Sequence, residues 1–289
     1  MREPSWQWHS PDALIARVMR PRPRNRVSLR SFERDLMCSR CSELGRLANS
    51  QQRHLLALAF FESAFNVKED AGLLISAINM RLKAGQCTIA AALYTQLLHG
   101  QHRSYSTACN LSGPQRELVL RKLTEANEAI EARARAAQSI QDPTAGADDA
   151  ARILVARRRL ASDPSRLEDE VTQLVAPLPR GELREKDQRE LETLVQLLRD
   201  LGQHANRSGD CDAAVHFFDA CFAVSRQPAD LLSAANMRVR LEPMSNAAEA
   251  LYELLLGELS PLDGRMSTPE LQTAARKLEA LRHTRQQLR

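Results

Sequence analysis

Two short clusters of cysteine and histidine are the residues of this sequence best suited to chemistry. Cys38-Ser-Arg-Cys41 is the only CxxC, and His99-Gly-Gln-His102 is the only nearby pair that would complete a four-ligand zinc site. The residues around the CxxC instead follow a helical pattern, and no strand precedes it, which argues against a redox motif. We interpret these thiols as small apolar core residues, and we expect neither a metal nor a cofactor.

Motifs of the common enzyme classes are absent from the sequence. It contains no GxxxxGK[ST], GxGxxG, GxSxG or HExxH. The acids alternate with arginines in a way that is typical of solvated pairs along helix faces. We therefore expect a protein without enzyme activity. A catalytic site assembled from residues far apart in the sequence is the alternative.

Composition indicates that helices must position these residues. The chain has 289 residues, of which 43% are apolar and 4% aromatic, enough for one large or two modest cores. Ala, Leu, Arg, Glu and Gln dominate, and these residues favour helices. No apolar run is long enough to span a membrane, and the first ten residues lack the apolar centre of a signal peptide. We expect a cytoplasmic protein with six reduced cysteines.

Punctuation by Pro, Gly and Asp divides the chain into four parts. Residues 1–30 are rich in Pro and Arg and predict an extended arm, and residues 1–34 carry eight Arg against three acids. Residues 31–140 and 182–289 predict two helical domains, each ending in a capping helix, at Gln115–Ser139 and Thr268–Gln287. Residues 141–181 predict a linker with bridging helices.

An internal duplication relates the two helical domains at an offset of 157 residues. LGRLANSQQRHLLALAFFESAFNV, from Leu44, aligns with LGQHANRSGDCDAAVHFFDACFAV, from Leu201. Further on, ISAINMR aligns with LSAANMR, and an LY dipeptide follows in each copy after one extra residue in the second. The matched residues are small or apolar at helical spacing, so the duplication preserves a packing pattern.

Each copy resembles a pair of tetratricopeptide repeats. The four units are residues 38–71, 72–104, 195–228 and 229–261, and Leu201–Gly202, Ala214, Phe218 and Pro228 occupy the characteristic positions of one of them. The resemblance covers about half the chain and implies an all-α fold: a divergent α-solenoid of antiparallel helix hairpins in two duplicated lobes.

The same resemblance implies a concave surface lined by the first helix of each hairpin. Its exposed positions would be Ser42, Arg46, Asn49, Ser76, Met80 and Lys83 in the first copy, and Arg199, Gln203, Asn206, Ser233, Met237 and Arg240 in the second. Polar and flexible groups of this kind suit a peptide or helix laid in a groove. For the Asn79-Met80 and Asn236-Met237 steps the alternative is a structural bridge between adjacent helices.

The N-terminal arm predicts a second contact with partners. Its residues Trp6, Trp8, Arg17, Arg20, Arg22, Arg24 and Arg26 would bind an acidic surface, with the tryptophans as anchors. A solvated tail is the alternative.

Together these features predict a non-catalytic scaffold or assembly subunit that binds partner proteins in a larger complex. A cytoskeletal or ciliary assembly fits by analogy of architecture. The alternative is an RNA-binding helical-repeat factor, but the helical body lacks a basic face, which makes nucleic acid the weaker hypothesis.

Overall fold

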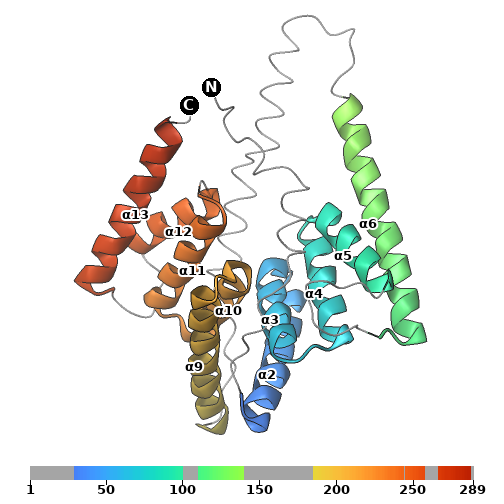
Figure 1. Ribbon diagram of the computed structural model, residues 1–289, viewed down its shortest axis with the longest axis horizontal. Coiled ribbons are helices and arrows are strands. Elements are labelled where there is room, and N and C mark those ends of the chain that lie inside the picture. The colour runs from blue at the N-terminus through green and yellow to red at the C-terminus, as the bar shows by residue number, and fades with distance from the viewer. Residues whose placement is uncertain (1–28, 100–109, 140–184, 244, 258–265, 288–289) are drawn as a thin grey trace, which may run out of the picture.

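The computed structural model describes residues 29–99, 110–139, 185–243, 245–257 and 266–287. All secondary structure in these residues is α-helical, in ten helices (Figure 1). The first half of the described chain contains α2 (Ser31–Ser50), α3 (His54–Val67), α4 (Ala71–Lys83), α5 (Cys87–His99) and α6 (Gly113–Ser139). The second half contains α9 (Glu185–Arg207), α10 (Cys211–Ser225), α11 (Pro228–Leu241), α12 (Asn246–Leu256) and α13 (Thr268–Gln287).

Local signals in the sequence account for where several helices begin. Asp70 accepts hydrogen bonds from the amides of Gly72 and Leu73 at the start of α4, and Asp210 accepts one from Ala213 at the start of α10. Such side-chain acceptors satisfy amides that have no partner within the helix. Pro228 stands in the first turn of α11, where its missing N–H costs nothing.

The turn that precedes the second helix of each half contains a residue in the left-handed backbone conformation, with a positive φ. Gly209 has a φ of 80° between α9 and α10, and Gln52, which precedes it by the 157-residue offset, has a φ of 60° between α2 and α3. Glycine adopts this conformation without steric cost, whereas glutamine does so with some strain. The turn geometry is thus kept in both halves although the residue type is not.

Consecutive helices pack against one another in pairs. In the first half α2 packs on α3, α3 on α4, α4 on α5 and α5 on α6, and the second half repeats this order from α9 to α13 (Figure 1). The glycine of each first hairpin lies beside a phenylalanine ring: a Cβ added at Gly45 would lie 3.0 Å from Phe61, and one at Gly202 would lie 2.9 Å from Phe218. Only glycine lets the two helices approach this closely.

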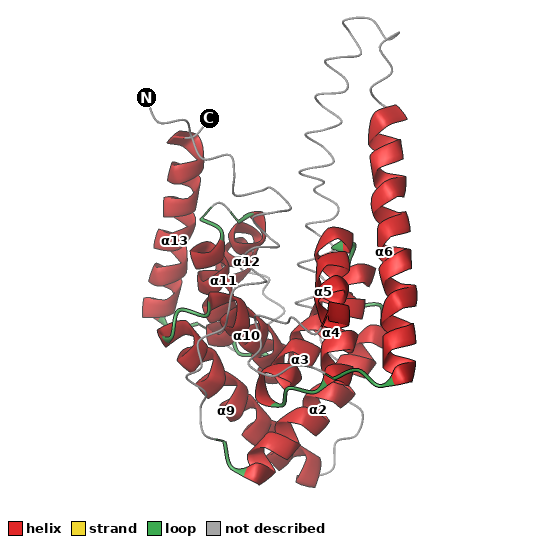
Figure 2. Ribbon diagram, turned by 45° about the vertical axis from the view of Figure 1, so that its right-hand side comes forward, coloured by secondary structure: helices red, strands yellow, loops and turns green. Residues whose placement is uncertain are grey.

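The two halves meet through equivalent helices. Helix α3 packs on α10, and α2 contacts α9, so the α2–α3 and α9–α10 pairs lie at the centre of the molecule while α6 and α13 lie at opposite sides (Figures 1 and 2). We call the contact of α3 with α10 and of α2 with α9 the inter-half interface. At its edge, Arg40 of α2 forms an ion pair with Glu190 of α9.

Three apolar clusters hold this arrangement together. The central cluster takes side chains from α2, α3, α9 and α10, with further residues from α4 and α11. A second cluster joins α4, α5 and α6 around Phe65, and a third joins α11, α12 and α13 around Phe222. Phe65 and Phe222 are related by the 157-residue offset, and both are at most 1% exposed. The central core therefore belongs to both halves.

Two predicted helix ranges agree closely with the structure. Helix α13 runs from Thr268 to Gln287, as expected, and α6 begins at Gly113, two residues before the predicted Gln115. Residues 1–28 of the predicted arm lie outside the described residues, as do His102 and the bridging helices predicted in 141–181.

Candidate functional site

Ten of the twelve predicted concave-surface residues reach solvent at least in part. Arg46, Lys83, Gln203 and Arg240 are exposed, and Ser42, Asn49, Ser76, Arg199, Asn206 and Ser233 are half-buried. Lys83 Nζ of α4 donates a hydrogen bond to Asn49 Oδ1 of α2, at 2.9 Å. Arg240 of α11 makes the equivalent hydrogen bond to Asn206 of α9, 157 residues later. In each half the structure thus brings the predicted residues of two helices together.

The predicted exposure of Met80 and Met237 is wrong. These side chains are only 4% and 5% exposed and belong to the central core. The physical reason is helical spacing: Ala77 and Met80 stand one turn apart on the same face of α4, and this face packs toward α3. The unbranched thioether fills space between helices and is not available to a partner.

The asparagines beside these methionines bridge helices. Tyr94 of α5 donates a hydrogen bond to Asn79 Oδ1 of α4 at 2.5 Å, and Tyr252 of α12 donates to Asn236 Oδ1 of α11 at 2.7 Å. Both tyrosine rings are fully buried, and burial raises the pKa of each phenol. The structural alternative from the sequence is therefore the correct one for both asparagines.

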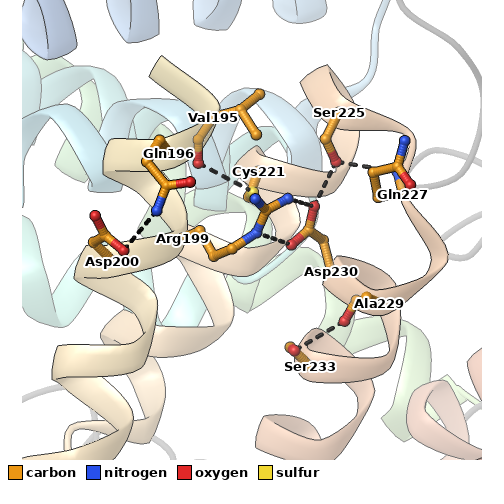
Figure 3. Close-up of polar contacts among 10 residues, drawn as sticks. All are labelled: Val195, Gln196, Arg199, Asp200, Cys221, Ser225, Gln227, Ala229, Asp230 and Ser233. Atoms are coloured by element: carbon orange, nitrogen blue, oxygen red, sulfur yellow. Dashed lines mark hydrogen bonds and ion pairs between the residues drawn. The ribbon is translucent and has the colours of Figure 1, made fainter. Parts of the chain in front are cut away.

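Arg199 forms a network that has no counterpart in the first half (Figure 3). Its Nε and Nη2 donate to the two carboxylate oxygens of Asp230 at 2.9 and 2.8 Å. Ser225 Oγ donates to the same carboxylate at 2.6 Å and accepts from the amide of Gln227 at 3.1 Å. The hydrogen bonds to Asp230 raise the pKa of Arg199 further above its ordinary value. At the positions of Arg199 and Asp230 the first half has Ser42 and Leu73.

This network changes what the second half offers to a partner. The Asp230 side chain is only 3% exposed, and the bidentate contact fixes the guanidinium of Arg199 against it. A charge that is already neutralised within the protein attracts an acidic ligand weakly. Among the predicted residues of the second half, Arg240 is therefore the cation most exposed to solvent.

The cysteines lie at helix contacts. Cys38 Sγ of α2 lies 3.8 Å from the carbonyl of Ala64 in α3, and Cys221 Sγ of α10 lies 3.6 Å from the carbonyl of Val195 in α9 (Figure 3). The two contacts occupy the same place in the two halves with the thiol on opposite helices. Burial raises the pKa of Cys41, so its thiolate is disfavoured. Among the described residues, no three His, Cys, Asp or Glu side chains are grouped to hold a metal ion.

The inter-half interface carries a polar cluster that the sequence analysis did not single out. Glu62 of α3 and Arg81 of α4 form an ion pair at 3.1 Å, with side chains 3% and 5% exposed. Asp219 of α10 and Arg238 of α11 form the equivalent pair at 2.7 Å, with side chains 6% and 11% exposed. Both members of the second pair follow those of the first by 157 residues.

Two residues extend this cluster across the interface. Arg81 Nη2 of the first half lies 3.5 Å from His216 Nε2 of α10, and Ser63 Oγ donates to the carbonyl of His216 at 3.4 Å. The signal for the cluster was present in the sequence. An acid recurs in the middle of the apolar helices α3 and α10, and an arginine recurs in the Asn-Met-Arg step of α4 and α11. Charges kept at such positions must be paired when buried.

None of the described helices combines the length and apolar character that crossing a membrane requires. Comparisons of the chain with protein-family models, with curated proteins and with solved structures gave no match.

Proposed function

We propose that this protein is a non-catalytic scaffold that binds other proteins through the exposed faces of α2, α4, α9 and α11. In this proposal the helix pairs are divergent tetratricopeptide-like hairpins that form two duplicated lobes of an α-solenoid. The close contacts of Gly45 with Phe61 and of Gly202 with Phe218 support it, because repeat hairpins need one position without a side chain where their helices cross.

One observation carries the functional part of the proposal. The asparagine–cation hydrogen bond between the first helices of successive hairpins occurs in both halves, as Asn49–Lys83 and as Asn206–Arg240. Each bond ties two neighbouring helices into one polar surface that faces solvent. The more deeply buried ion pairs, by contrast, connect helices inside the molecule. The surface groups are the ones that a partner can reach.

The chemistry of this surface favours a polar segment that carries acids. Arg46 and Lys83 provide exposed cations in the first half, and Arg240 provides one in the second. Serine and amide side chains lie between them and can donate or accept hydrogen bonds along an extended chain or a helix. Because Arg199 is neutralised by Asp230, the two halves present different charge patterns, and we expect them to prefer different segments.

The experiment is affinity capture from native extract, read by quantitative mass spectrometry, with charge-reversed variants. Lys83→Glu and Arg240→Glu alter the proposed surfaces, and Arg276→Glu on the exposed side of α13 is the matched control. Each captured protein is then produced separately and its Kd measured by calorimetry. Partners bound by the wild type and the control, but lost in one surface variant, support the proposal and assign that partner to a half.

Two results would redirect the proposal. Partners that survive both reversals but disappear when residues 1–30 are removed place recognition in the arm. Binding of RNA that weakens steeply as salt rises, without any protein partner, supports the RNA-binding alternative, because phosphate contacts release counterions.

A further inference from the structure

His216 lies at the inter-half interface with its ring facing a guanidinium of the opposite half. Arg81 Nη2 is 3.5 Å from His216 Nε2 and 3.1 Å from Glu62 Oε1. The three residues are at most 8% exposed. Arginine has only donors, so Nε2 must be the acceptor, and this requires an uncharged imidazole that carries its proton on Nδ1.

The contact has no equivalent on the other side of the interface. Position 59, which precedes His216 by the 157-residue offset, is alanine. Arg238, the equivalent of Arg81, binds Asp219 with two hydrogen bonds, of 2.8 and 2.7 Å. Arg81 gives Glu62 a single hydrogen bond and turns Nη1 to Gln86 at 3.1 Å. Arg81 Nη2 thus serves both Glu62 and His216, and Nη1, which the equivalent arginine also gives to its carboxylate, goes to Gln86.

Among the described residues, four charged groups act on His216: Arg81, Glu62, Asp212 and Asp219. Burial lowers the pKa of His216, and the charge of Arg81 lowers it further. Asp212 and Asp219 of the same helix and Glu62 of α3 act in the opposite direction. Glu62 and Asp219 are already held in ion pairs, which limits the stabilisation that they can offer a second cation.

We propose that the inter-half interface is a pH-sensitive joint: in mild acid His216 takes up a proton, loses its acceptor contact with Arg81 and destabilises the packing of α3 on α10. In the closed interface the imidazolium would lie against a guanidinium without water to screen the repulsion. Once the helices separate, the same imidazolium is hydrated. The proton therefore favours the open state.

The direction of the effect follows from proton linkage. A solvated histidine has a pKa of about 6.5. In the closed interface burial lowers the pKa of His216 below this value. Above that value the closed interface has its full stability. Below it, opening becomes about tenfold more favourable for each pH unit, until the closed state is protonated too.

The experiment is hydrogen–deuterium exchange of the full chain at about pH 7.4 and about pH 5.2, corrected for intrinsic exchange rates. Peptides from α3 and α10 report on the interface, and peptides from α5 and α12 serve as internal reference. His216→Gln is the test variant, since its side-chain oxygen still accepts from Arg81 but does not titrate. We expect wild-type protection of α3 and α10 to fall about tenfold or more in acid, and that of the variant to fall less than about threefold.

Two histidines provide matched controls. His283→Gln changes an exposed residue of α13 and should leave the wild-type pH response unchanged. Burial also lowers the pKa of His54, and His54→Gln should likewise leave the acid response of α3 and α10 unchanged. If His216→Gln does not fold, His216→Ala replaces it, because Ala59 fills the equivalent position. Three results overturn the proposal. Wild type and His216→Gln lose equal protection in acid, neither loses protection, or the acid response disappears only in His54→Gln.

Discussion

The ion pair between Asp219 and Arg238 should be strongly coupled, although it repeats a pair that the first half also contains. Its two hydrogen bonds, of 2.8 and 2.7 Å, join side chains that are 6% and 11% exposed. We consider three variants: Asp219→Leu, Arg238→Met, and the two substitutions together. Each single variant leaves one charge inside the protein without its partner, whereas the double variant leaves none.

The size of the effect follows from burial and distance. Charges about 4 Å apart attract by about 4 kcal/mol at an effective dielectric constant near 20. Removing one member of a buried pair costs about 3 to 5 kcal/mol of unfolding free energy, because the other charge stays desolvated. Replacing both with apolar residues of similar volume is often close to neutral. The double variant should therefore be more stable than either single variant, with a coupling energy of at least about 2 kcal/mol.

Urea titration, monitored by far-ultraviolet circular dichroism, measures the free energy of unfolding of the wild type, the two single variants and the double variant. The pair Lys122–Glu125, on the exposed side of α6, is the control, because its side chains are 26% and 53% exposed. A double-mutant cycle there should give less than about 0.5 kcal/mol. If the losses of Asp219→Leu and Arg238→Met simply add in the double variant, the two charges do not stabilise each other and the account of this cluster is refuted.

Three further predictions concern packing and reactivity. Truncating Phe61 or Phe218 to Ala should lower the free energy of unfolding by about 3 to 5 kcal/mol in each case, since both rings fill the space beside a glycine. Urea titration measures this loss, and a loss below about 1 kcal/mol for either variant would contradict the equivalence of the two rings. Replacing Tyr94 or Tyr252 by Phe should cost about 0.5 to 1.5 kcal/mol in thermal denaturation, because an asparagine oxygen loses its donor. An unchanged Tm would show that water replaces the phenol. Burial raises the pKa of Cys41, so in the native protein this thiol should not react with maleimide until urea is added. Rapid labelling of Cys41 in the native protein, detected by peptide mass spectrometry, would show that α2 opens.

Packing within each half could be predicted from the sequence because it depends on contacts that are local in the chain. The apolar period placed α6 and α13 within two residues of their observed starts. The duplicated Leu-Gly and Phe-Phe steps indicated which helices approach closely, and the structure places Gly45 against Phe61. These features follow from helical spacing and from the size of single residues.

The inter-half interface could not be predicted in the same way, since a duplicated pattern says how each copy packs but not how the copies meet. The structure shows what the interface covers: residues 56–65 of α3 are all buried, so this helix has no solvent face over most of its length. A helix that is apolar on every side must be covered on every side. Met80 of α4, assigned to the surface from repeat positions, lies in the same central core.

The shared central core also sets an order of events during synthesis. Helix α3 leaves the ribosome before α10, which begins at Cys211, 144 residues after α3 ends at Val67. At ordinary translation rates that interval is on the order of 10 s, far longer than a helix needs to form. Throughout that interval the nascent chain presents Phe60 and its neighbours without the helix that covers them. We therefore expect the nascent first half to be prone to aggregation until α10 has been made.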